Sequence, residues 1–519
     1  MLASAPEQDR DNSPRARVRA MLQVRGRYRI LHLTWFAFFL SFVVWFNFAP
    51  FANVIGDDLG LSDAQVKTLG LCNIALTVPA RLFIGMALDR WGPRRVYGAI
   101  LLFAAVPNTI FAFAHSFEVM VFSRLLVSIV GAGFVVGIRM VSEWFPPAEL
   151  GMAEGVYGGW GNFGAAAAAF SLPLAAGWVG GDEGWRWAIF AVGLIAAVYG
   201  LVYLRSVQDT PDGVTYARPR RQGALEVTSP GGVWGLAALT VPLSVALGVI
   251  AWRVWRVDAI SGPVLAGTLV AIGGLLVLQE MAVFRVNRPA LADSYPAADR
   301  YPVRSVAVLC LAYFATFGSE LAVVTMLPVF FADTWGLGPA AAGVAASAFA
   351  FVNLVARPGG GLLSDLFGSR RQTLRWLLVG LVGGYLLLAT LDTAWPWVLA
   401  IVACVACSFF VQSGAGAVYA VVPLVKKRVS GQIAGLVGAY GNVGAITFLT
   451  ASLFVSDRVF FLVIAATAAV GLACSRFLVE PANSFSTELG ELGASELGEG
   501  VEAALGAVDP DPDLARAVS

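Results

Sequence analysis

The chain of 519 residues is 58% hydrophobic and 13% charged, and its formal net charge is +1. This composition excludes a soluble globular protein, and the balanced charge gives no basic surface for a nucleic-acid partner. The five cysteines lie in apolar stretches, which is typical of small buried side chains rather than of disulfides or a metal site. We therefore expect an all-α polytopic membrane protein that needs no cofactor.

Apolar runs of about twenty residues recur along the chain, each long enough to cross a bilayer core of roughly 30 Å. An N-terminal tail (1–30) precedes a predicted six-helix bundle (31–206) with spans at 31–55, 64–88, 97–115, 117–144, 150–178 and 186–206. A linker (207–302) leads to a second six-helix bundle (303–478) with spans at 303–331, 337–363, 373–392, 396–424, 430–455 and 458–478. The last segment (479–519) is acidic, and we expect it to be disordered.

The linker contains two further apolar stretches, at 233–252 and 262–282. They form either an extra transmembrane pair or a hairpin lying on the cytoplasmic face of the membrane. Arg253 and Arg256 would lie in an external turn if the pair spans, which is unfavourable. Both stretches are nearly uncharged, however, and this favours the spanning pair.

Charged residues divide the predicted loops into two sets. Basic residues cluster at 15–29, 90–95, 205–221, 370–375 and 426–428, whereas most of the alternate loops are acidic. Excess Lys and Arg mark the cytoplasmic side of a membrane. We therefore expect a multi-pass protein of the inner (plasma) membrane with both termini in the cytoplasm.

Three short motifs occur twice in the same order and at nearly constant spacing. They are "RLFIGMALDRWGPRR" (81–95) with "RPGGGLLSDLFGSRR" (357–371), "GAGFV" (131–135) with "GAGAV" (414–418), and "GNFG" (161–164) with "GNVG" (441–444). Both copies have the same direction relative to the basic loops, so the two bundles are parallel repeats. A parallel repeat places a binding site between its halves, near the middle of the membrane.

The first motif resembles the signature of the major facilitator superfamily, Gly-x-x-x-Asp-x-x-Gly-x-Arg-Arg. The resemblance implies two six-helix bundles related by a pseudo-twofold axis, and a cytoplasmic charge network that stabilises one conformation. The alternative is that the basic residues only orient the chain in the membrane. The gating residues implied are Gly85, Asp89, Arg94 and Arg95 in the first half, and Gly361, Asp365, Arg370 and Arg371 in the second.

Arg81 and Arg357 occupy equivalent positions about 12 Å inside the membrane, at 1.5 Å per helical residue. Each costs roughly 2.5–3.5 kcal/mol at the membrane centre, and neither helix offers an acidic neighbour at that depth. Two guanidinium groups facing one cavity repel each other unless an anion lies between them. Their planar edges suit a small flat oxyanion, because each can donate paired hydrogen bonds.

The glycine–asparagine motif reaches the same depth as the arginines. Its glycines let helices or a small ligand approach the backbone closely, and small-residue packing alone would explain them. It does not explain an asparagine in each copy. The candidate binding residues are Gly161, Asn162 and Gly164, with Gly441, Asn442 and Gly444.

Paired GxxGNxG helices with one arginine in the second helix of each half resemble the nitrate/nitrite porter family (NarK-like). The resemblance covers most of 31–478 and implies secondary transport of nitrate and/or nitrite by a functional monomer in the lipid bilayer. It also implies that the arginines bind the anion and that aromatic rings close around it. Tyr313 and Phe317 match the family's tyrosine and stacking phenylalanine, and either Phe42 or Phe46 is the opposing ring.

Glu320 is a carboxylate well inside the predicted seventh helix of the repeat, and this position suggests a role in function. It is either a proton carrier for nitrate–proton symport or a permanent partner of Arg357, Arg81 or Arg139. Nitrate/nitrite antiport would need no carrier. Arg139 and Glu143, spaced as i and i+4, are expected to be structural or gating residues.

Other functions remain open at this point. Another small anion such as formate or oxalate fits the same chemistry, and a non-transporting sensor that signals through the acidic tail is a less favoured hypothesis. The sequence has no phosphate-binding loop, so we expect neither an enzyme nor ATP-driven transport.

Overall fold

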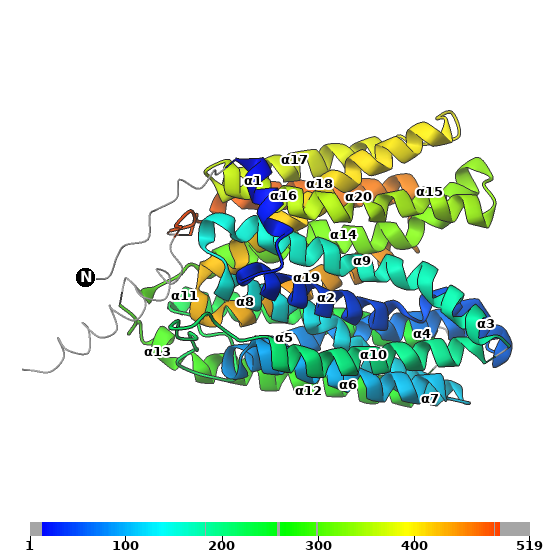
Figure 1. The fold of residues 1–519 in the computed structure, drawn as a ribbon, viewed down its shortest axis with the longest axis horizontal. Coiled ribbons are helices and arrows are strands. Elements are labelled where there is room, and N and C mark those ends of the chain that lie inside the picture. The colour runs from blue at the N-terminus through cyan, green and yellow to red at the C-terminus, as the bar shows by residue number, and fades with distance from the viewer. Residues whose placement is uncertain (1–12, 182, 257–259, 297–298, 482, 488–519) are drawn as a thin grey trace, which may run out of the picture.

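The computed structural model describes residues 13–181, 183–256, 260–296, 299–481 and 483–487. These residues form helices and connecting turns without a strand, and thirteen helical segments among them are long and apolar enough to cross a membrane (Figure 1). The predicted all-α polytopic fold is confirmed. Most of the acidic tail, from residue 488 onward, lies outside the described residues.

The first half of the molecule corresponds to the first predicted bundle. A short helix, α1 (Pro14–Met21), precedes it. The bundle consists of α2 (Arg27–Phe46), η1 (Ala49–Phe51), α3 (Ala52–Asp58), α4 (Asp63–Ala75), α5 (Thr77–Trp91), α6 (Pro93–Ala112), α7 (Phe117–Ser128), η2 (Ile129–Gly133), α8 (Phe134–Trp144), α9 (Pro147–Val179) and α10 (Gly184–Ser206).

The second half follows the same plan. It consists of α14 (Val303–Trp335), α15 (Pro339–Phe351), α16 (Asn353–Leu366), α17 (Arg370–Leu388), α18 (Trp397–Val425), η4 (Lys427–Val429), α19 (Ser430–Ala451), α20 (Asp457–Cys474) and η5 (Ser475–Phe477). The halves meet mainly where α5 packs against α19 and α9 packs against α16. Each of these contacts pairs a helix that carries a site arginine with one that carries a glycine–asparagine motif.

The second membrane-spanning segment of each half is broken at an equivalent point. Leu76 separates α4 from α5, and Val352 separates α15 from α16, where the sequence predicted single helices. The first break is held by a neighbouring helix, because the N–H of Leu76 donates to Ser128 Oγ at 3.1 Å. Each break is five residues before an arginine, Arg81 or Arg357, so both arginines project from the first turns of a new helix.

The linker forms an antiparallel helix pair, α11 (Pro230–Arg256) and α12 (Gly262–Val286), followed by the short α13 (Arg288–Leu291). Helix α11 packs on α14 and α19 and also contacts α4 and α5. The pair therefore runs alongside the bundles in Figure 1, and this arrangement favours a spanning pair over a hairpin lying across one face. Helix α12 has no buried residue in its most apolar stretch.

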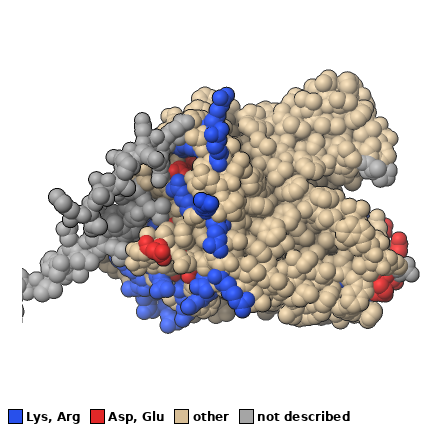
Figure 2. Space-filling view, viewed as in Figure 1, with Lys and Arg blue, Asp and Glu red and all other residues tan. Residues whose placement is uncertain are grey.

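The two ends of the molecule differ in charge and in shape. Lys and Arg gather at the end on the left of Figure 2, which we call the basic end. The opposite end is hollowed between two lobes in the same view. Hydrogen bonds from Asp89 and Asp365 join the two halves at the basic end, so the structure is closed there and opens toward the other end.

Candidate functional site

Arg81 lies in the second turn of α5 and is fully buried. Its Nη1 donates to the carbonyl of Gly438 on α19, in the other half. Its Nε and Nη2 have no hydrogen-bond partner among the described residues. These two N–H groups share one edge of the guanidinium plane and point in the same direction. This edge can donate paired hydrogen bonds to two oxygens of a planar anion.

Arg357, at the equivalent position of α16, is also buried but has protein partners. Its Nη2 forms an ion pair with Glu320 Oε2 at 3.0 Å, and Glu320 Oε1 accepts from Asn353 Nδ2 at 2.8 Å. Asn162 approaches from the first half; with its amide oxygen turned toward the guanidinium, it accepts from Nη1 at 2.8 Å and Nη2 at 3.0 Å. The site is thus asymmetric: the charge of Arg357 is neutralised by Glu320, whereas the Nε–Nη2 edge of Arg81 has no partner among the described residues.

One aromatic ring connects the two arginines. The Cζ of Arg81 is 5.6 Å from the centre of the Phe317 ring, and the Cζ of Arg357 is 5.3 Å from the same centre. Tyr313 stacks on Phe317 at 5.0 Å, and Phe134 of α8 lies 5.8 Å from Arg81 Cζ. The structure therefore brings Arg81, Arg357, Phe317 and Tyr313 together at the interface of the halves, as the resemblance implied.

The candidate rings of the first helix lie further from the arginines. Phe42 contacts Phe38 at a centroid distance of 4.4 Å and Phe46 at 5.5 Å. Phe38 in turn lies 5.2 Å from Phe134, which is the ring that reaches Arg81. Phe42 thus joins the aromatic layer through Phe38, and Phe46 lies one ring beyond it.

The motif glycines allow very close helix contacts. A methyl group at Gly441 would lie 2.7 Å from the Phe317 ring and 2.8 Å from the Tyr313 ring. The other three motif glycines pack equally tightly: Gly161 against the Phe38 ring, Gly164 against the backbone of Phe39, and Gly444 against the backbone of Phe314.

Asn442 follows Gly441 on α19 and is fully buried. Neither its amide oxygen nor its amide nitrogen has a hydrogen-bond partner among the described residues. Its repeat counterpart, Asn162, bonds to Arg357. Asn353 Oδ1, beside Arg357, also lacks a partner among the described residues, so buried polar groups without partners occur on both sides of the interface.

Asp89 and Asp365 make equivalent contacts across the interface at the basic end. Asp89 of α5 accepts two backbone N–H groups in the first turn of α19, both at 3.0 Å. Asp365 of α16 accepts two near the start of α9, at 3.0 and 2.8 Å. A carboxylate is favourable at a helix N-terminus, where N–H groups lack partners. The close approach depends on Gly85 and Gly361, where a side chain would meet the backbone of the other half.

The other predicted gating residues divide between the interface and their own half. Arg370 forms a buried ion pair with Asp365 at 2.9 Å and also donates to the carbonyl of Pro147 on α9. Arg139 of α8 donates to Ser430 Oγ at 2.5 Å and pairs with Glu143 at 2.8 Å. The bonds of Arg370 to Pro147 and of Arg139 to Ser430 join the two halves at the basic end, whereas each of the two ion pairs lies within one half.

Arg94, Arg95 and Arg371 lie in the equivalent turns of the two halves. The N–H of Arg94 donates to Asp209 at 2.7 Å and the N–H of Arg371 donates to Glu480 at 3.1 Å, so each turn is tied to an acid that follows the last helix of its own half. Burial raises the pKa of Asp209, which the N–H of Arg94 and the nearby arginines partly offset. Arg95 is exposed.

Several residues at or near the site were not assigned by the sequence. Asn353 donates a hydrogen bond to Glu320. The sequence could have indicated this residue, because it is polar and lies one turn before Arg357 in an apolar helix. Phe134 belongs to the second repeated motif. Glu154 is buried one turn before the Gly158–Gly159 pair of α9, and its oxygens lack hydrogen-bond partners among the described residues.

Arg124 lies toward the end of the molecule opposite the basic end, and its contacts are structural. It donates to Asn47 Oδ1 at 2.8 Å and to the carbonyl of Trp45 at 3.0 Å, and it also contacts Asn73 Oδ1. It is as deeply buried as Arg81, but its contacts are all within the first half.

Comparisons with known proteins identify the family of the chain. The model of the Major Facilitator Superfamily matches residues 34–298 and 309–509. The nitrate/nitrite transporter NrtP of Picosynechococcus sp. is 48% identical over 509 residues, covering 90% of this chain and 95% of that protein. NrtP of Nostoc punctiforme is 47% identical, covering 90% and 96%. The solved E. coli fucose:proton symporter FucP is 13% identical with a TM-score of 0.58, covering 88% and 100%, and supports the fold alone.

The fold and the buried interface site define a multi-pass membrane transporter rather than an enzyme. The chain belongs to the Major Facilitator Superfamily and, within it, to the nitrate/nitrite porter family that its sequence resembles.

Proposed function

We propose that this protein transports nitrate and/or nitrite by alternating access, with the anion clamped between Arg81 and Arg357. The observation that carries the proposal is the Nε–Nη2 edge of buried Arg81, which has no partner among the described residues and lies at the interface of the halves beside Phe317. Relatives 48% and 47% identical over most of the chain are named nitrate/nitrite transporters. The protein would act as a monomer, because both halves of the site come from one chain.

The chemistry of the site supports a small planar anion. The paired N–H groups of Arg81 match two oxygens of a flat oxyanion, and Phe317 offers a ring face beside both guanidinium groups. Asn442 supplies a further buried amide that has no hydrogen-bond partner among the described residues, and the Tyr313 hydroxyl lies nearby. Formate or oxalate shares part of this chemistry, so competition by formate against labelled nitrate uptake measures the selectivity directly.

We infer that Glu320 couples anion binding to a proton. In this conformation its carboxylate competes with any anion for Arg357, since the two are paired at 3.0 Å. A proton taken up by Glu320 would remove its charge and free Arg357 to bind the anion. Anion and proton would then bind together, and the pair would cross as a symport.

The contacts at the basic end support a switch between two conformations. Asp89 and Asp365 each hold the start of a helix from the other half, and these bonds must break before the basic end can open. The concentration of Lys and Arg there supports a cytoplasmic position for this end and for both termini, in the plasma membrane. The structure then corresponds to an outward-facing state, with two bundles, 31–206 and 303–478, as the moving bodies.

A second mechanism is favoured by one specific observation. Glu320 also accepts from Asn353 at 2.8 Å, so it is held in place as a fixed counter-ion to Arg357. A fixed counter-ion suits nitrate/nitrite antiport, in which the occupied anion site itself permits the switch.

Purified protein in proteoliposomes distinguishes the mechanisms. Labelled nitrate uptake is measured with an imposed pH gradient, and separately with nitrite inside at equal pH. Symport predicts uptake driven by the pH gradient alone, and antiport predicts uptake only with internal nitrite. Absence of nitrate uptake under both conditions, with the protein correctly inserted, would refute the proposed function.

A further inference from the structure

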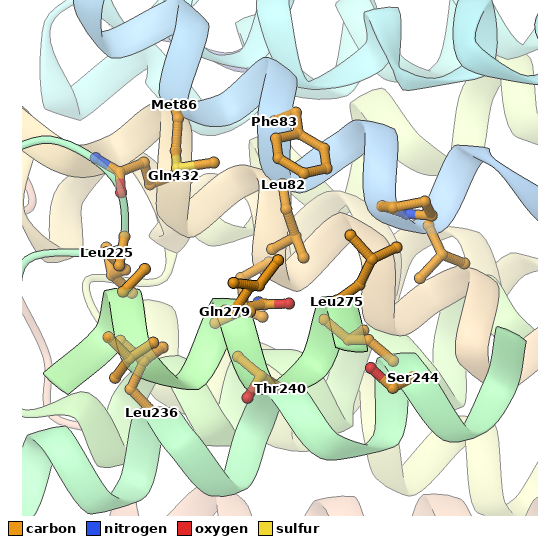
Figure 3. Close-up of a pocket in the computed structure, with 18 of the residues that line it drawn as sticks. Leu82, Phe83, Met86, Leu225, Leu236, Thr240, Ser244, Leu275, Gln279 and Gln432 are labelled. Carbon is orange, nitrogen blue, oxygen red and sulfur yellow. The ribbon is translucent and has the colours of Figure 1, made fainter. Parts of the chain in front are cut away.

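A cavity of about 380 Å³ lies between the linker helices and the core of the transporter (Figure 3). Its walls come from α5, α11, α12 and α19, and the segment Gly223–Leu225 lies at one end. Most of the lining is aliphatic or aromatic, including Leu82, Phe83, Leu236 and Leu275. This cavity is separate from the anion site, and the transport mechanism does not use it.

The surroundings of the cavity place it in contact with the hydrocarbon region of a membrane. Helix α12, which forms one wall, has no buried residue along its most apolar stretch, so lipid must cover that helix. Its lining is predominantly aliphatic and aromatic, with the polar side chains Thr240, Ser244, Gln279 and Gln432 among them. The hydrocarbon chain of a lipid is the chemistry that fits it.

One polar side chain, Gln432, lies at the end of the cavity nearest the basic end, whereas Thr240, Ser244 and Gln279 lie further along it. Gln432 lines this end beside Leu225 and Met86 (Figure 3). The side chain of Gln432 is 95% buried, and its Oε1 has no hydrogen-bond partner among the described residues. It can accept a hydrogen bond from the polar part of a ligand whose apolar part fills the cavity.

Exposed basic residues surround the same end. Arg221 lies two residues before Gly223, and its Nη1 donates to the carbonyl of Val286 at the end of α12 at 3.4 Å. Arg285, at the end of α12, and Arg288, at the start of α13, are also exposed. An acyl chain inside the cavity would place its headgroup beside these arginines, where a negative charge is favourable.

The cavity also bridges the two halves. Leu82 and Phe83 belong to α5 of the first half and Gln432 to α19 of the second, and the backbone N–H of Gln432 donates to Asp89 at the closed basic end. The linker pair rests on the second half, since the Tyr440 hydroxyl donates to the carbonyl of Leu239 on α11 at 2.9 Å. Separation of α5 from α19 would therefore dismantle the cavity.

We propose that this cavity binds the acyl chain of a phospholipid with an anionic headgroup, and that the bound lipid stabilises the conformation closed at the basic end. A ligand that fits one conformation shifts the population toward it by its difference in affinity. The bound acyl chain fills the space between α5, α12 and α19 and contacts all three helices. Its binding needs no anion substrate, so the lipid site itself does not depend on the proposed function, whereas its effect on conformation rests on the proposed switch at the basic end.

The test is native mass spectrometry of the full-length protein, delipidated in detergent and titrated with phosphatidylglycerol or phosphatidylcholine. We expect one phosphatidylglycerol to be retained at least tenfold more tightly than phosphatidylcholine. Leu275→Trp, which fills the cavity, should remove this retained lipid. Val270→Trp, at an exposed position of the same helix, is the matched control and should retain it.

Two further variants separate the parts of the proposal. Replacing Arg221 and Arg285 by Ala should abolish the preference for phosphatidylglycerol while keeping the cavity. Asp89→Asn should weaken lipid retention, because it weakens the closed state. Equal retention of the two lipids by the wild-type protein, or unchanged retention in Leu275→Trp, would overturn the assignment of the site; unchanged retention in Asp89→Asn would overturn the link to conformation.

Discussion

Arg81→Lys tests the central feature of the site, because it keeps the positive charge and removes the paired N–H edge. Lysine presents a compact point charge with no planar fork, so at least one of two charge-assisted hydrogen bonds to the anion is lost. Such a bond contributes about 1.5–3 kcal/mol. At 1.4 kcal/mol per tenfold change, we expect nitrate affinity to fall roughly 10- to 150-fold.

The assay is calorimetric titration of nitrate into purified protein, with labelled nitrate exchange in proteoliposomes as a second readout. Arg124→Lys is the matched control: Arg124 is equally buried and is held by Asn47 and the Trp45 carbonyl, away from the site. We expect that variant to lose thermal stability and keep its nitrate affinity. Wild-type affinity in Arg81→Lys, or an equal loss of affinity in both variants, would refute the role of the guanidinium edge.

Three further predictions follow from the contacts of the site and the basic end. Glu320→Gln should abolish uptake driven by a pH gradient and preserve nitrate/nitrite exchange, both measured in proteoliposomes, because the amide carries no proton across; pH-driven uptake at the wild-type rate would contradict the coupling role. Asp89→Asn should open the basic end more often. The rate at which a cysteine introduced between α5 and α19 at that end reacts with a thiol reagent should rise by at least about tenfold, the equivalent of one charge-assisted hydrogen bond. Asp209→Asn, which acts within one half, should leave this rate unchanged. Gly441→Ala should cost about 1–3 kcal/mol by overpacking and weaken nitrate binding, while Gly383→Ala, which meets open space, should do neither in a thermal melt or a titration.

The sequence predicted the framework of the molecule because that framework depends on local composition and on spacing. A run of apolar residues identifies a span wherever it occurs, and a duplicated chain keeps the distance between equivalent residues. Arg81 and Arg357 could therefore be matched without knowledge of any contact. Their joint position beside Phe317 agrees with that matching.

The partners of the site residues could not be predicted in the same way. Helices that are apolar on every side carry no polar stripe to define their rotation, so the sequence left open which ring from the first half approaches Arg81 in addition to Phe317. Phe134, from a different helix, lies there, and Phe42 reaches the layer only through Phe38. The breaks at Leu76 and Val352 were also missed, because they depend on contacts with other helices.

The sequence by itself determined the two repeated halves, the burial of one arginine in each, and the glycine–asparagine motifs, because a bilayer tolerates such residues only at particular depths. Only the tertiary structure decided that Arg357 is neutralised by Glu320 while Arg81 keeps an unpaired edge, and that Asp89 and Asp365 hold helices of the opposite half. The physical reason is that these properties belong to pairs of groups brought together by helix packing, and the two copies of a repeat can pack differently although their sequences match.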